Sequence, residues 1–174
     1  MARFDFSSKC AHPKKCHNLM VDFLKVATSL SDEIYLEKGS DGFCTNLEDK
    51  PGPGIFIEYD YSDINYPVSS YEFLHFVHEK DKLTKGFSEL TISLLHELGH
   101  KETFKDIPKN YDRNKALREI NKMTKKNLKK ANQMYFCLID ENLATEWAIQ
   151  WLSQKENRKI AKKFEKKFFK AWRG

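Results

Sequence analysis

A strongly apolar segment that also contains two histidines and a glutamate constrains the fold of this chain more than any other feature. The segment runs from Leu90 to Phe104, and its leucine and isoleucine side chains spread around much of a helix, which predicts a buried helix over 87–104. Burying an ionisable side chain costs free energy unless that side chain finds a partner. The ionisable residues of the sequence HELGH over 96–100 are therefore candidates for a shared chemical role.

Residues 96–100 form an HExxH motif, in which His96 and His100 are four positions apart. On a helix this spacing places both imidazoles on one face, where both can bind one metal ion. Glu97 then lies beside the metal, where it can take a proton from a metal-bound water. Zinc lowers the pKa of such a water toward about 7, so the motif predicts Zn²⁺ as the cofactor and Glu97 as the catalytic base. Gly99 inside a helix costs about 1 kcal/mol relative to alanine, which indicates close approach of another backbone.

The third metal ligand has to come from another part of the chain, since a catalytic zinc usually has three protein ligands and a water. No histidine follows His100, so a downstream ligand must be a carboxylate or a cysteine. The candidates in a later apolar helix are Cys137, Asp140, Glu141 and Glu146. Glu141 is favoured because it shares a helix face with Ala144 and Ala148, which allow close approach to another helix. Glu146 lies about 140° further round the helix, so it is an alternative to Glu141 rather than a second ligand, and Asp140 also stays open.

The pattern along the whole chain predicts an α+β fold with a small N-terminal sheet and a mostly helical body. Segments rich in β-branched and aromatic residues predict strands over 33–37, 42–46 and 55–61, the first two forming a hairpin. Helical spacing predicts further helices over 17–30, 71–82, 112–135, 137–153 and 155–172. The polar residues 1–16 are expected to form an irregular arm, and the stretch 155–174 a basic amphipathic helix.

The charges are divided unevenly along the chain. Residues 1–100 carry 10 basic and 16 acidic side chains, whereas residues 101–174 carry 20 basic and 9 acidic ones. Lysine pairs fall on the expected outer helix faces at 125–126, 129–130, 162–163 and 166–167. Such runs are typical of a solvated face, and they also suit an anionic partner. Nucleic acid is the less favoured partner, because only 5 of the 30 basic residues are arginine.

Composition excludes several classes of protein. No apolar run approaches the 18 to 20 or so residues that span a bilayer, the start has no apolar signal region, and 4 cysteines are too few for a disulfide scaffold. We therefore expect a cytoplasmic, reduced protein with no membrane partner. Four metal-capable residues near the start, Cys10, His12, Cys16 and His17, do not have the usual zinc-finger spacing. Two interpretations of these residues therefore stay open, a second metal site and an incidental cluster.

The sequence LLHELGH over 94–100, followed by E-x-x-A-x-x-W-A over 141–148, resembles the gluzincin branch of zinc metallopeptidases. Within that branch it is most similar to the ImmA/IrrE-type metallopeptidases, which are intracellular and include members that cleave a transcriptional repressor. The resemblance implies His96, His100 and Glu141 as zinc ligands, Glu97 as the general base, and a zincin-like fold. It also implies a single metallopeptidase domain over 1–174 that hydrolyses a protein or peptide substrate, with a regulatory protein as one such substrate.

The sequence departs from this resemblance at two positions. Leu143 stands where that family often has a second glutamate, and Thr145 stands where thermolysin-like enzymes place an aspartate behind a ligating histidine. Zinc peptidases also need a donor for the tetrahedral oxyanion, and Tyr111, Arg113 and Tyr135 are candidates between which the sequence does not choose. The alternative hypothesis is a metal-stabilised binding module whose basic C-terminal helices hold nucleic acid or an acidic protein without turnover.

Overall fold

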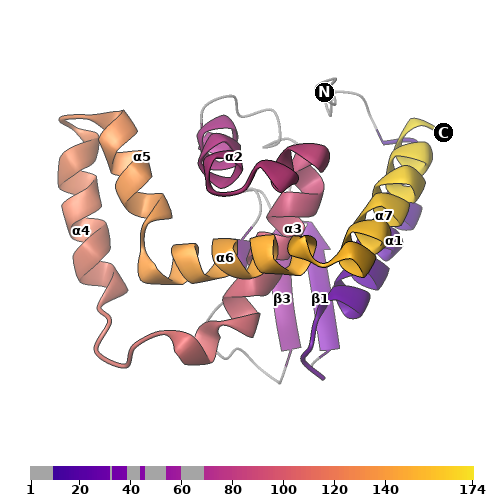
Figure 1. Ribbon diagram of the computed structural model, residues 1–174, viewed down its shortest axis with the longest axis horizontal. Helices are drawn as coiled ribbons and strands as arrows, with labels where there is room; N and C mark the ends of the chain where they lie inside the picture. The colour runs from indigo at the N-terminus through magenta and orange to yellow at the C-terminus, as the bar shows by residue number, and fades with distance from the viewer. Residues whose placement is uncertain (1–9, 32, 39–43, 46–53, 60–68) are drawn as a thin grey trace.

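The computed structural model describes residues 10–31, 33–38, 44–45, 54–59 and 69–174 of the chain. These residues are mostly helical, as the sequence predicts, with a small sheet beside them (Figure 1). The helices predicted over 71–82, 87–104, 137–153 and 155–172 are confirmed to within two residues at each end. The α-helices are α1 (Pro13–Ala27), α2 (Ser69–Lys80), α3 (Glu89–Glu102), α4 (Arg113–Thr124), α5 (Leu128–Phe136), α6 (Ile139–Ser153) and α7 (Lys155–Arg173), and the 3-10 helices are η2 (Lys82–Gly86) and η3 (Phe104–Asp106).

The sheet has three strands in the order β1-β3-β2, where β1 is Glu33–Lys38, β2 is Cys44–Thr45 and β3 is Gly54–Tyr59. β3 pairs in parallel with β1 and antiparallel with β2. The predicted hairpin of the first two strands is therefore wrong, because β3 lies between them. β1 and β3 pair along the whole length of both strands, which leaves β2 on the other edge of β3. Residues 42, 43, 46, 60 and 61 of the predicted strands lie outside the described residues.

α1 begins earlier than the sequence predicts. Pro13 occupies its first turn, where the fixed φ of proline suits a helix and the missing N–H is not needed. The irregular arm predicted over 1–16 is therefore wrong for residues 13–16, while residues 1–9 lie outside the described residues. α1 packs along α7, where Phe23 stacks on Phe164 with ring centroids 4.3 Å apart.

The single helix predicted over 112–135 is in fact two helices, α4 and α5, which form an antiparallel hairpin. The side chain of Asn127 accepts a hydrogen bond from the backbone N–H of Lys130 at 3.0 Å, which caps the start of α5. The apolar stripe continues across this break, because Ile120, Ala131 and Leu138 pack together in a small core of their own. Helical spacing alone therefore could not locate the break.

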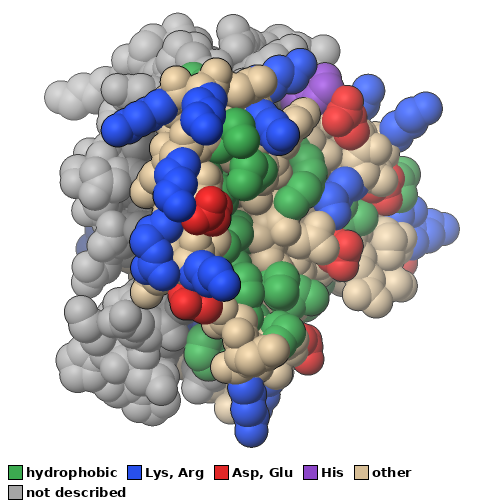
Figure 2. All heavy atoms as spheres, turned by 90° about the vertical axis from the view of Figure 1, so that its left-hand side faces the viewer, with side chains coloured by type: hydrophobic (Ala, Val, Ile, Leu, Met, Phe, Trp, Pro, Cys, Tyr) green, Lys and Arg blue, Asp and Glu red, His purple; other side chains and the backbone are tan. Residues whose placement is uncertain are grey.

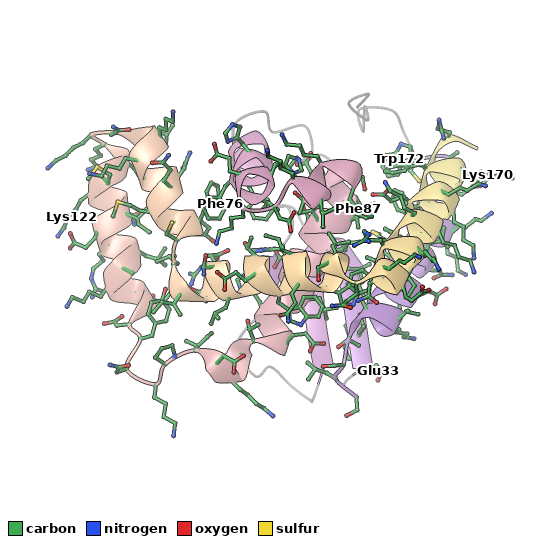
Figure 3. All side chains as sticks on the ribbon, in the orientation of Figure 1. Glu33, Phe76, Phe87, Lys122, Lys170 and Trp172 are labelled. Atoms are coloured by element: carbon green, nitrogen blue, oxygen red, sulfur yellow. The ribbon has the colours of Figure 1, made fainter. Side chains whose placement is uncertain are left out.

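All of the predicted lysine pairs are exposed, but only those at 129–130, 162–163 and 166–167 lie on helices, because Lys125 and Lys126 fall in the turn between α4 and α5. Figure 2 looks onto the α4–α5 end of the molecule and shows Lys and Arg side chains gathered around an apolar stripe. Lys122 projects outward from α4, far from Lys170 on α7, in Figure 3. No helix within the described ranges combines the length and the apolar composition that crossing a lipid bilayer requires.

α3 lies at the centre of the helical body, and every residue from Leu90 to His100 is buried. Its largest set of helix contacts is with α6, which crosses it in Figure 1. The fold therefore presents the HELGH segment of α3 to the first half of α6.

Candidate metal centre

The histidines and the glutamate of the motif lie together in the interior of the protein. His96 is 5 % exposed, Glu97 7 % and His100 6 %. The potential ligand atoms of these three residues all lie within 4.8 Å of one another, and among the described residues they are the one such group of His, Cys, Asp or Glu. The four residues of the N-terminal Cys/His cluster do not gather in this way, although Cys10 Sγ lies 3.3 Å from Cys16 Sγ.

Gly99 explains how a second helix reaches this site. A Cβ atom on residue 99 would lie 2.5 Å from the backbone oxygen of Ala144, a separation that real Cβ atoms do not tolerate. The glycine therefore lets the α6 backbone rest directly on α3, as the cost of a helical glycine predicted. Glu141 lies one turn before Ala144 on α6, so this contact brings its carboxylate to the motif.

Glu141 is the candidate third ligand that the structure brings to both histidines. Its Oε2 lies 3.1 Å from His96 Nε2 and 3.5 Å from His100 Nε2. The other candidates face elsewhere. Asp140 contacts Arg113 at 2.6 Å, while Glu146 and Cys137 are exposed on the outer surface.

The separations of Glu141 from the two histidines match those between ligands of one zinc ion. Ligand atoms at about 2.0–2.1 Å from a tetrahedral zinc lie about 3.3 Å from each other. The two Glu141–histidine separations of 3.1 and 3.5 Å bracket that value. Two imidazole nitrogens and a carboxylate oxygen are also the donor set of many catalytic zinc sites. Glu141 Oε2 therefore lies where a third ligand would, although the three residues whose ligand atoms all lie within 4.8 Å of one another are His96, Glu97 and His100.

His100 and Glu141 shift the pKa of each other. Burial lowers the pKa of His100, but its hydrogen bond to Glu141 and the charges of Glu97, Glu141 and Asp140 outweigh burial and raise that pKa above its usual 6.5. Burial raises the pKa of Glu141, but hydrogen bonds and charges from His100 and His96 outweigh burial and hold that pKa well below its usual 4.5. Glu141 is therefore ionised at neutral pH, as a metal ligand has to be.

Thr145 fills the position behind His96. Its Oγ1 lies 3.2 Å from His96 Nδ1, the ring nitrogen that faces away from Glu141. Metal-binding histidines usually hydrogen-bond through this second nitrogen, which fixes their orientation. Among the described residues His100 Nδ1 has no such partner. From the sequence, Thr145 is only a departure from the aspartate of thermolysin-like enzymes. Its contact with His96 is visible only in the structure.

Two of the predicted oxyanion donors, Tyr111 and Arg113, contact carboxylates of α6 instead, and the third, Tyr135, contacts Arg113. Tyr111 donates to Asp140 Oδ1 at 2.9 Å, and Arg113 Nη2 lies 3.0 Å from Glu141 Oε1 and 3.3 Å from the Tyr135 hydroxyl. Burial, followed by the hydrogen bond to Asp140, raises the pKa of Tyr111 to about 12. Burial and the charge of Glu141 likewise raise the pKa of Tyr135. Both tyrosines therefore stay neutral donors at physiological pH.

The comparisons with known proteins add no family to this geometry. The chain matches no protein-family model, and neither curated proteins nor solved structures give a significant match.

Proposed function

We propose that this protein is a zinc-dependent endopeptidase with a zincin-like α+β fold, related in mechanism to the ImmA/IrrE-type metallopeptidases. His96, His100 and Glu141 hold Zn²⁺, and Glu97 is the general base. The observation that carries the proposal is the contact of one Glu141 oxygen with the Nε2 atoms of both motif histidines. The proposed substrate is a protein, with a regulatory protein of the cytoplasm as one such substrate.

The proposed mechanism assigns each part of the site a separate task. Bound zinc supplies a Lewis acid and an acidified water. Glu97 adjoins His96 on α3 and is 7 % exposed, so its carboxylate accepts a proton in a site from which most water is excluded and passes that proton to the leaving amine. Thr145 holds the His96 ring in orientation.

Replacement of Glu97 by glutamine tests the catalytic assignment. Glutamine keeps the shape of the side chain but cannot accept the proton, so we expect cleavage of fluorescein-labelled casein to fall at least about 100-fold. Zinc content, measured by elemental analysis, should stay near one ion per chain. Glu146→Gln, an exposed position on α6, is the matched control and should retain activity. Full activity of Glu97→Gln would refute the assignment of Glu97 as the general base.

A metal-stabilised binding module is the second candidate, and the burial of the site favours it. Structural zinc sites are closed, whereas catalytic sites keep a position open to substrate, and each of the four residues proposed here is at most 7 % exposed. Chelation separates the two functions. An enzyme should lose activity with a modest fall in thermal stability, whereas a structural module should unfold when the metal is removed.

A further inference from the structure

We propose that Arg113 is a positioning residue of this metal centre, which fixes the Glu141 carboxylate so that one of its oxygens faces the histidines. The inference rests on the proposed zinc site but not on peptide hydrolysis. Arg113 is the first residue of α4, on a hairpin separate in sequence from both helices that carry the proposed ligands.

The two oxygens of Glu141 are divided between different partners. Oε1 accepts a hydrogen bond from Arg113 Nη2 at 3.0 Å, while Oε2 lies 3.1 Å from His96 Nε2. A carboxylate held on one oxygen by a planar guanidinium has little freedom to rotate about its last torsion angle. The oxygen that faces the histidines is therefore placed before any metal binds.

Arg113 is itself anchored by Asp140, the residue before Glu141. Arg113 Nε lies 2.6 Å from Asp140 Oδ2, and the Asp140 side chain is 1 % exposed. Tyr111 donates to the other oxygen of Asp140 at 2.9 Å. The carboxylate of Asp140 offsets the charge of the guanidinium, so Arg113 adds little net positive charge beside the proposed cation site.

A purely structural role is the competing explanation, because the same contacts tie α4 to α6. Both roles lower stability when Arg113 is removed. Only the positioning role also weakens metal binding by protein that remains folded, because residues that orient a metal ligand typically contribute about 10- to 100-fold in metal affinity.

The experiment measures zinc dissociation constants by competition with a chromophoric chelator, together with the visible spectrum of the Co²⁺-substituted protein. We expect Arg113→Met to bind zinc about 10- to 100-fold more weakly than wild type and to give an altered Co²⁺ spectrum. Arg113→Lys should fall between the two, because an ammonium group lacks the planar fork that contacts both carboxylates. Arg118→Met, an exposed position on the same helix, is the matched control and should bind zinc within about twofold of wild type.

A second variant keeps the test decisive if Arg113→Met does not fold. Asp140→Asn keeps the side-chain shape but removes the charge that anchors Arg113, and it should also weaken zinc binding. The inference is overturned if the folded Arg113 and Asp140 variants match wild type in zinc affinity and Co²⁺ spectrum, whatever their melting temperatures. Failure of wild type to bind zinc overturns the proposed function as well, whereas zinc binding without casein cleavage contradicts only the peptidase.

Discussion

A hydroxyl group stands behind His96, where an aspartate was expected from the resemblance. A hydroxyl both donates and accepts hydrogen bonds, whereas an ionised aspartate only accepts. Thr145 can therefore partner Nδ1 of His96 whether that nitrogen carries a proton or not. The threonine hydroxyl can therefore keep its hydrogen bond to His96 when the partner of His96 Nε2 changes from Glu141 to a bound metal ion.

Removal of this hydroxyl tests the role of Thr145 at the scale of one atom. Thr145→Val preserves the shape of the side chain, so we expect zinc affinity to fall about 10-fold. Thr124→Val, at a threonine whose hydroxyl bonds only within α4, serves as the control. Unchanged zinc affinity in the chelator competition would show that Thr145 does not orient His96.

At the scale of elements, the contact between α3 and α6 is the feature that builds the site. The sequence predicts both helices, and the cost of Gly99 predicts the close approach of another backbone, which the structure shows to be that of α6. It does not predict the break between α4 and α5, because the apolar stripe runs on past Asn127. The order of the strands was also unpredictable from local pattern, since pairing between distant segments decides it.

Gly99→Ala tests the contact between the two helices. The added methyl group would lie 2.5 Å from the Ala144 oxygen, so α3 and α6 have to separate. We expect the free energy of unfolding to fall by about 1–3 kcal/mol, measured by urea denaturation, with weaker zinc binding because Glu141 moves away. Gly86→Ala is the control, since a Cβ there meets nothing within 4 Å. Equal stability of Gly99→Ala and wild type would contradict this packing.

At the scale of the whole molecule, the acidic and basic parts of the chain meet at one group of side chains. α3, from the acidic first 100 residues, contributes the histidines, and α6, from the basic remainder, contributes Glu141. The sequence places these residues on the right helices, because each lies in a strongly apolar segment. It does not reveal that Arg113 reaches Asp140 and Glu141, because that contact joins positions 27 and 28 residues apart.

The opposite pKa shifts of Glu141 and His100 predict that the melting temperature depends differently on pH in the metal-free and the zinc-loaded protein. The pKa of Glu141 is lowered, so the stability it contributes is present above about pH 4.5 and is lost as the pH falls. The pKa of His100 is raised above 6.5, so its contribution is fully present below that pH and is lost as the pH rises. The metal-free protein should therefore melt at its highest temperature in mildly acidic solution. Zinc binds only neutral histidines. The rise in melting temperature on adding zinc should therefore increase from pH 6 toward pH 8. A rise that is the same at every pH would contradict the proposed competition between protons and zinc for His100.

The proposed function depends first on a single zinc ion held by His96, His100 and Glu141. The most direct measurement is a crystal structure of zinc-loaded protein with anomalous diffraction data at the zinc edge. We expect one anomalous peak about 2.0–2.2 Å from His96 Nε2, His100 Nε2 and Glu141 Oε2, with Glu97 near the ion but not bound to it. A peak coordinated by Glu97 in place of Glu141, or no peak between α3 and α6, would contradict it.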